Sequence, residues 1–243
     1  VKMIGFFPGQ GSQFVGMGKE LYENFKIARE ILDQLKPIKP ELLDTMLHES
    51  REGSVNLGDT SNAQPAIVAL SLATYFAFLE ANPLLKERQP LAFLGHSTGQ
   101  MSAIAAAGVV GTGTALRMAA ERGRLMKEVG EKEENKGGML ALLGASLEQA
   151  ESFCASISGA LGEGGIWVAN DNSVDQVILS GKKKYIEHAL AQAKEAGITK
   201  AVLIPVDIAA HCPLMQKAQN MFATYLADIE FHEPSSAVIL NTQ

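Results

Sequence analysis

The stretch at residues 91–100 constrains this chain most, because an apolar run leads directly into a serine between two glycines. The apolar residues 91–94 precede Gly95-His96-Ser97-Thr98-Gly99, and small residues then follow at helical spacing. Gly-x-Ser-x-Gly between a buried strand and a helix is typical of a nucleophile elbow, a strained turn that exposes the serine Oγ. Glycine-rich loops match so short a pattern by chance, so the flanking strand and helix carry the inference. The sequence therefore predicts that Ser97 is a nucleophile.

The composition is that of a globular enzyme. The 243 residues are 47% hydrophobic and 20% charged, enough for one large domain or one domain with an insertion. The net charge of −6 argues against nucleic acid as a partner. No apolar run reaches the roughly 18–20 residues of a membrane span, so no membrane is expected. Cys154 and Cys212 lie outside any metal-binding spacing, which argues against a zinc site and favours a reducing compartment.

Hydrophobic periodicity predicts strands and helices up to a charged, glycine-containing loop at 128–138. Residues 36–58 are mixed and carry no predicted element. The Gly9-Gln10-Gly11 sequence after the first strand lacks the third glycine of a dinucleotide-binding fingerprint and indicates a tight strand–helix turn. The predicted elements are a strand at 2–7, a helix at 17–35, a helix at 62–79 with Pro65 in its first turn, the elbow, and a helix at 113–129.

Beyond this loop, the predicted elements follow the order βαββαβ, which is typical of a split-βαβ or ferredoxin-like unit. This unit would be complete within 138–205 and would interrupt a larger α/β domain. A helix up to about 229 and an apolar strand at 237–240 follow it. The six elements of the unit are strands at 139–143, 166–169, 176–179 and 201–204, and helices at 147–157 and 184–196.

Several separated motifs together give the chain a resemblance to a known family. The main ones are Phe7–Gln13, Gly95–Gly99, Glu121–Met126 and His211–Met215; weaker ones are Asn62–Ala66 and Asn172-Ser173 before Gln176–Gly181. In this order they resemble the malonyl-CoA:acyl-carrier-protein transacylases. The combination spans the chain and is specific, although no single motif is. The resemblance implies an α/β-hydrolase-like large subdomain, 1–137 and 206–243, with an inserted ferredoxin-like small subdomain, 138–205.

The resemblance also implies a reaction and its residues. Ser97 would attack the thioester of malonyl-CoA and become acylated, and His211 would act as general base and then acid. A lone histidine is more often structural, but the Cys-Pro-Leu-Met that follows His211 matches the family. The backbone N–H groups of Gln10 and Thr98 would stabilise the oxyanion. The acyl group would then pass to the thiol of acyl carrier protein in a ping-pong mechanism.

Substrate choice would depend on Arg122, whose forked guanidinium suits the free carboxylate of the malonyl group. An acetyl group would leave this arginine a buried, unpaired charge. Gln64 and Asn172 match positions that line the acyl and pantetheine pocket in the family. The resemblance implies no metal or redox cofactor, with coenzyme A only as the substrate carrier. We expect a cytoplasmic monomer, acting in either fatty acid or polyketide synthesis.

The sequence departs from the family pattern at three places. Gln100 stands where glutamate is common, which removes a charge worth roughly 0.3–1 kcal/mol near a helix N-terminus. The small residues in Ile208-Ala209-Ala210 would widen the acyl pocket, so methylmalonyl remains an alternative to malonyl. The sequence ends at Asn241-Thr242-Gln243, ahead of a stretch that in the family supplies the carbonyl that orients the histidine. Without that stretch we expect poor activity.

Two alternatives from other functional classes stay open. A serine acyl hydrolase or thioesterase would complete Ser97 and His211 with an acid such as Asp207 or Asp175, in the chain order Ser, Asp, His. Arg122 counts against an editing hydrolase on the same scaffold, which would lack this carboxylate-binding arginine. The other alternative is an inactive module that only docks a carrier protein.

Overall fold

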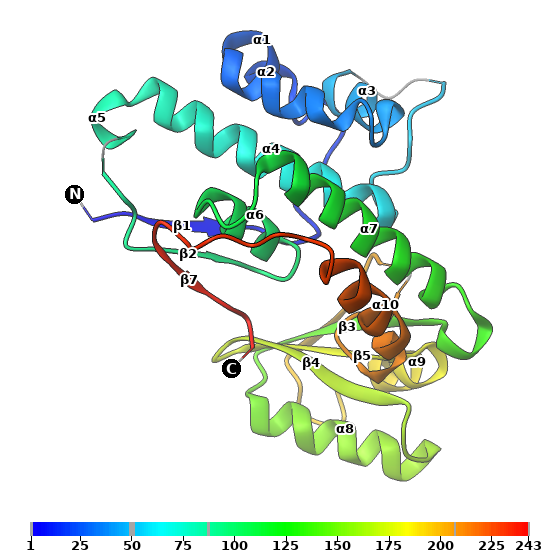
Figure 1. Ribbon diagram of the computed structural model, residues 1–243. Coiled ribbons are helices and arrows are strands. Elements are labelled where there is room, and N and C mark those ends of the chain that lie inside the picture. Colours follow the sequence, from blue (N-terminus) through cyan, green and yellow to red (C-terminus); the bar gives the residue numbers. More distant parts are fainter. Residues whose placement is uncertain (1, 49–51, 87, 207, 243) are drawn as a thin grey trace. The chain divides into compact units, whose positions relative to one another are not determined.

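The computed structural model describes residues 2–48, 52–86, 88–206 and 208–242 of a mixed α/β chain (Figure 1). It divides into two compact units. The first consists of Val1–Arg124 and Thr224–Gln243, and the second of Leu125–Ala223. The predicted insertion at 138–205 lies inside the second unit, which extends beyond it on both sides.

A parallel three-stranded sheet of order β1-β2-β7 forms the centre of the first unit. The strands are β1 (Ile4–Phe7), β2 (Ala92–Gly95) and β7 (Ala237–Ile239), close to their predicted ranges. In register, Phe7 lies opposite Gly95 and Leu94 lies opposite Ile239. Because β1 and β2 are parallel neighbours, the loop after Phe7 and the turn after Gly95 leave the same edge of the sheet.

Helix α6 (Gly99–Ala106) follows β2 and packs on both β1 and β2. Its buried Ala103 contacts the core formed by Phe7 and Phe93. Tyr75 packs edge-on against Phe93 in the same core, with ring centroids 5.5 Å apart. The strand, sharp turn and helix predicted around Ser97 are therefore present, and the turn rests on an aromatic core.

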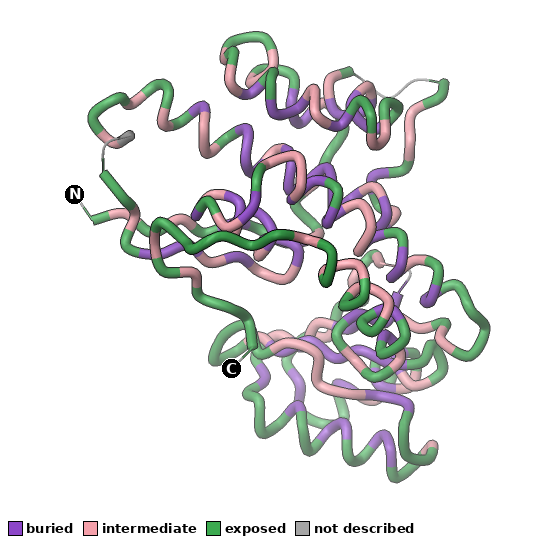
Figure 2. The backbone as a smooth tube through the Cα atoms, viewed as in Figure 1, coloured by how far each residue is buried: buried purple, intermediate pink, exposed green. Residues whose placement is uncertain are grey.

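The long helix α4 (Thr60–Ala81) packs against α2 and α6. It starts two residues earlier than predicted, because the Asp59 side chain caps it by accepting a hydrogen bond from the Ser61 N–H at 2.8 Å. Pro65 therefore lies inside the helix, and its placement in the first turn was wrong. By length and composition α4 would be able to cross a membrane, but 61% of its most apolar window is buried in the structure, as in a core helix (Figure 2).

The remaining helices of this part of the chain differ from prediction in two places. The single helix predicted at 17–35 is interrupted at Phe25, whose backbone is extended (φ −124°, ψ 121°). A helix that the mixed composition of 36–58 did not reveal begins with Pro40 at its N-terminus. The elements are α1 (Lys19–Asn24), α2 (Lys26–Leu32), η1 (Asp33–Leu35), α3 (Pro40–Leu47), α5 (Pro83–Lys86) and α7 (Thr112–Gly130), the last of which continues into the second unit.

The second unit contains an antiparallel sheet of order β4-β5-β3-β6, with the predicted βαββαβ order of elements. Leu140 and Leu142 of β3 face α8 and α9 and form one core with Phe153 and Ile186. The elements are β3 (Gly137–Leu143), α8 (Leu147–Leu161), β4 (Ile166–Ser173), β5 (Gln176–Lys182), α9 (Lys183–Gln192) and β6 (Lys200–Ile204).

The opposite face of this sheet is covered as well, because side chains alternate along each strand. Met139 and Ile178 point to this face and pack with Leu125 from the end of α7 and Met215 from the segment before α10. This second core explains why the unit reaches from Leu125 to Ala223 instead of stopping at the predicted 138–205. The elements flanking this core are η2 (Glu133–Asn135), η3 (Pro213–Met215) and α10 (Gln216–Leu226).

Candidate active site

Ser97 occupies the turn between β2 and α6 with a left-handed backbone, φ 49°. Within the described part of the chain, only Ser97 and His211 combine a positive φ with a side chain other than glycine's. Such a conformation costs about 1–3 kcal/mol and persists only where the surroundings impose it. Ser97 is half-buried, and the N-cap residue Thr98 is fully buried. The turn has the strained geometry expected of a nucleophile elbow.

Close backbone approaches explain the glycines around this turn. A Cβ on Gly99 would collide with the carbonyl oxygen of Phe7, and one on Gly9 would lie 2.7 Å from the carbonyl oxygen of His96. Only glycine fits such positions without moving the backbone. In addition, the His96 N–H donates to the Phe7 carbonyl at 3.0 Å. The loop that carries Gln10 is therefore held against the elbow.

Arg122, on α7, points its guanidinium at the same turn. Its Nη1 donates to Gln64 Oε1 at 2.7 Å and to Thr98 Oγ1 at 3.2 Å. Its Nη2 donates to Ser97 Oγ at 3.4 Å, a long hydrogen bond. The structure thus brings Gln64 of α4 and Arg122 of α7 together with Ser97 and Thr98 of the turn.

Thr60 connects this group to Gln10 and was not predicted. Gln64 Nε2 donates to Thr60 Oγ1 at 2.9 Å, and Thr60 Oγ1 donates to Gln10 Oε1 at 2.9 Å. The Gln10 Nε2 atom is buried without an acceptor among the described residues. The Asp-Thr-Ser sequence at 59–61 signals a helix start, and Thr60 gains its place in the network because that start lies beside the Gln10 loop.

Arg122 is a half-buried cation that forms no ion pair with an acidic side chain of the described residues. Burial lowers the pKa of Arg122 to about 10, so the group is still protonated at neutral pH. A buried, unpaired charge is costly unless a ligand of opposite charge completes it. The site is therefore suited to an acyl group that carries a carboxylate.

Two backbone donors beside Ser97 remain available. The N–H groups of Thr98 and Gln10 donate to no acceptor in the described ranges. By contrast, the Ser97 N–H donates to Asn241 Oδ1 at 2.7 Å, and Asn241 Nδ2 donates to the Gly95 carbonyl at 2.7 Å. Asn241 was also not predicted, and only its position after an apolar strand could have drawn attention to it.

His211 belongs to the second unit, where it is exposed between β6 and η3 with φ 59°. Its neighbours hold the turn: Cys212 Sγ donates to the Ala209 carbonyl at 3.2 Å, and the Met215 N–H donates to the Cys212 carbonyl at 2.9 Å. Ala210, which precedes the histidine, is buried. The sequence motif thus forms a tight turn that exposes the imidazole.

The other predicted residues of the second unit lie at the β4–β5 hairpin. Asn172 is exposed, and its Nδ2 donates to Gln176 Oε1 at 3.1 Å. The exposed Asp175, considered as a hydrolase acid, accepts a hydrogen bond from Ser173 Oγ at 2.7 Å. Asp207, the other candidate acid, lies outside the described residues.

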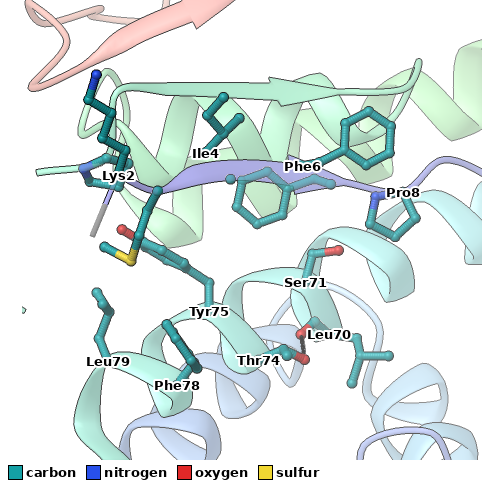
Figure 3. Close-up of a pocket in the computed structure, with 14 residues that line it drawn as sticks. Lys2, Ile4, Phe6, Pro8, Leu70, Ser71, Thr74, Tyr75, Phe78 and Leu79 are labelled. Atoms are coloured by element: carbon teal, nitrogen blue, oxygen red, sulfur yellow. Dashed lines mark hydrogen bonds between the residues drawn. The ribbon is translucent and has the colours of Figure 1, made fainter. Parts of the chain in front are cut away.

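An apolar groove of about 660 Å³ lies between β1 and α4 in the first unit (Figure 3). Phe6 and Ile4 line it from the strand, and Tyr75, Phe78 and Leu79 line it from the helix. None of the predicted site residues lines this groove. Across the described ranges, no group of three or more His, Cys, Asp or Glu side chains is arranged to hold a metal ion.

Comparison with known sequences connects this site to a family. The family model of the acyl transferase domain matches residues 6–243. Malonyl CoA-acyl carrier protein transacylase of Haemophilus influenzae is 34% identical over 242 residues, which cover 99% of this chain and 74% of that protein. The protein of the same name from Bacillus subtilis is 33% identical over 241 residues, covering 99% of this chain and 72% of the relative.

Solved structures give the same result. FabD from Acinetobacter baumannii superposes with a TM-score of 0.85 at 33% identity, covering 98% of this chain and 72% of that one. A malonyl-transacylase solved in complex with its holo type II PKS acyl-carrier protein superposes with a TM-score of 0.86 at 30% identity. The match covers 98% of this chain and 74% of that one.

Proposed function

Because this chain belongs to the acyl transferase domain family, we propose that it transfers a malonyl group from malonyl-CoA to the phosphopantetheine thiol of acyl carrier protein. The observation that carries the proposal is Arg122, a cation without a carboxylate partner in the described residues, with its Nη2 3.4 Å from Ser97 Oγ. We assign an α/β-hydrolase-like fold to the first unit and a ferredoxin-like fold to the sheet and helices of the second.

The reaction proceeds in two half-reactions. Ser97 Oγ attacks the thioester carbonyl while His211 takes its proton; the carbon–sulfur bond then breaks, and the coenzyme A thiolate leaves with that proton. Malonyl-Ser97 remains. His211 next takes the proton of the carrier-protein thiol, whose sulfur attacks the ester carbonyl, and Ser97 Oγ regains a proton as it leaves. This sequence is a ping-pong mechanism through one acyl-enzyme.

The oxyanion of each tetrahedral intermediate is stabilised by the backbone N–H groups of Thr98 and Gln10. Both donors lack an acceptor in the described residues, and the Gly9 approach holds the Gln10 loop against the elbow. A donor of this kind is worth about 3 kcal/mol of activation free energy.

Specificity arises from the pairing of Arg122 with the malonyl carboxylate. Gln64 keeps one edge of the guanidinium in place, and Thr60 in turn fixes Gln64. Acetyl-CoA offers no carboxylate and is a poor substrate. Asn172, exposed at the end of β4, contributes to pantetheine binding. Coenzyme A serves as the substrate carrier, and we propose no further cofactor. We also propose that the enzyme is cytoplasmic and monomeric.

Acid-quenched intact-mass spectrometry tests this function. After mixing with malonyl-CoA, the wild-type protein is expected to gain one malonyl group, which holo acyl carrier protein then removes. Acetyl-CoA is expected to label it far less, and Ser97→Ala not at all. Carrier proteins from fatty acid and polyketide systems, offered separately, identify the acceptor.

Arg122→Ala is expected to lose the preference for malonyl over acetyl, whereas Arg117→Ala, an exposed arginine of the same helix, keeps it. Equal labelling of wild-type protein by both thioesters would contradict the role of Arg122. Loss of the adduct to water at the same rate with and without carrier protein would indicate a thioesterase. Carrier binding without any adduct would indicate a docking module.

A further inference from the structure

Asn241 continues the β2–β7 ladder past the end of β7. The ladder pairs Phe93 with Val238 and Leu94 with Ile239. In the same register, Asn241 falls opposite His96, the residue between Gly95 and Ser97. The Asn241 carboxamide bonds to Gly95 and Ser97, the two residues on either side of His96. Its Nδ2 donates to the Gly95 carbonyl and its Oδ1 accepts from the Ser97 N–H, both at 2.7 Å.

These two bonds reproduce the pattern of a parallel sheet. In a parallel pair, every second residue donates its N–H to the carbonyl of the residue before its partner, and its own carbonyl accepts from the N–H of the residue after that partner. Asn241 makes the same two bonds with its side chain. On the other edge of β2, the His96 N–H donates to the Phe7 carbonyl at 3.0 Å. The segment that leads into Ser97 is therefore held on both edges.

We propose that Asn241 is a positioning residue that fixes the nucleophile elbow by acting as a side-chain extension of strand β7. A non-glycine residue at φ 49° needs surroundings that impose this conformation, and the Asn241 bonds flank it directly. By holding the Ser97 N–H, Asn241 also orients the next peptide, whose Thr98 N–H is the proposed oxyanion donor. The inference rests on the proposed function, because it assigns Asn241 to the reactivity of Ser97.

Two variants separate the two bonds. Asn241→Asp keeps an acceptor for the Ser97 N–H and loses the donor to Gly95, while Asn241→Leu loses both. Thr242→Ala, at the exposed neighbouring residue, is the matched control. The rates of Ser97 modification are measured with malonyl-CoA and with phenylmethylsulfonyl fluoride. In the sulfonyl reagent the sulfur–fluorine bond breaks and sulfur bonds to Ser97 Oγ, so fluoride leaves and the hydroxyl proton passes to solvent. The reagent has no carboxylate for Arg122 to bind.

In each variant we expect both reagents to react more slowly with Ser97, and by the same factor. The expected factor is about tenfold for Asn241→Asp and about a hundredfold for Asn241→Leu, because small displacements of a reacting atom have effects of this size. The KM for malonyl-CoA is expected to be unchanged, since Arg122 is untouched. Hydrogen exchange at the Ser97 amide is expected to be faster in the Leu variant and unchanged in Thr242→Ala.

The folded fraction of each variant is measured by circular dichroism, and the rates are normalised to it. Wild-type rates in both Asn241 variants after this correction would overturn the proposal, as would unchanged exchange at Ser97. Should Leu prevent folding, the modification rates of the Asp variant decide, because that variant keeps the acceptor for the Ser97 N–H and exchange at Ser97 is not expected to change in it. If the wild-type protein reacts with the sulfonyl fluoride but not with malonyl-CoA, the proposed function fails while the role of Asn241 is still measured.

Discussion

The turns at Ser97 and His211 share a left-handed backbone but are stabilised differently. Ser97 (φ 49°) lies between a strand and a helix, where polar backbone groups of β1 and the Asn241 carboxamide surround it. His211 (φ 59°) lies between short irregular segments. Besides the two hydrogen bonds of Cys212, its turn is anchored by buried apolar neighbours, Ile208, Ala210 and Met215, in the core of the second unit.

The difference agrees with the proposed task of each residue. A nucleophile and its oxyanion donors act together, so the backbone that carries both must be fixed to a fraction of an ångström. Hydrogen bonds supply that precision because they are directional. A general base acts through the tip of a side chain, for which an exposed imidazole on a well-packed turn is sufficient. Substitutions at each turn test this interpretation.

The largest expected effect is that of Gly99→Ala at the Ser97 turn. The new Cβ would meet the carbonyl oxygens of Phe7 and Pro8, which are backbone atoms and cannot move aside as a side chain does. We expect a loss of about 3 kcal/mol in the free energy of unfolding, measured with urea. In Gly159→Ala, on helix α8, the Cβ meets nothing within 4 Å, and a gain of about 0.5–1 kcal/mol is expected. Equal effects would show that the elbow is not closely packed.

At the His211 turn, the corresponding substitution is Ile208→Ala, which removes a buried side chain that is only 4% exposed. We expect a loss of about 2–3 kcal/mol from lost burial and the remaining cavity. Because Ile208 packs in the core of the second unit, hydrogen exchange at the Ser97 amide is expected to stay at its wild-type rate in the folded protein. Faster exchange at Ser97 would contradict separate stabilisation of the two turns.

The extent to which the sequence predicts this site depends on how local each signal is. The Ser97 elbow depends on glycines and apolar residues within ten positions, so its strand, turn and helix were predicted. The hydrogen bond from Thr60 to Gln10 joins residues 50 apart in sequence, and that from Ser97 to Asn241 joins residues 144 apart. No local pattern marks such contacts, because they exist only once the sheet has formed.

The same reasoning applies to the fold. The βαββαβ order was predicted because each element has its own periodicity. The full extent of the second unit was not predicted, because it depends on which segments cover the second face of the sheet. Residues such as Leu125 and Met215 make that contact. The interruption at Phe25 also escaped prediction, since the apolar spacing continues across it.

A smaller effect is expected from relieving the strain at either turn. Glycine tolerates a positive φ, whereas alanine pays about 1–2 kcal/mol for it. At position 97 and at position 211, the glycine variant is therefore expected to have a free energy of unfolding about 1 kcal/mol higher than that of the alanine variant. This figure includes the larger entropy of glycine in the unfolded state. Urea unfolding of Ser97→Gly against Ser97→Ala, and of His211→Gly against His211→Ala, measures the difference. A preference for alanine at one position would show that this turn relaxes to an ordinary backbone.

The smallest expected effect concerns Cys212, which follows His211 and reports on how tightly that turn is packed. Burial raises the pKa of the Cys212 thiol above its ordinary value, so less thiolate is present at pH 8 than in a free cysteine. Alkylation by iodoacetamide at pH 8 is therefore expected to be slower than that of glutathione and to accelerate as the pH rises. Cys154, whose pKa is raised to about 12 by burial and by Glu151, is expected to react more slowly still. Peptide mass spectrometry distinguishes the two sites. Alkylation of Cys212 as fast as that of a free thiol would mean that the turn opens readily, and that the apolar core does not hold the left-handed backbone of His211 in place.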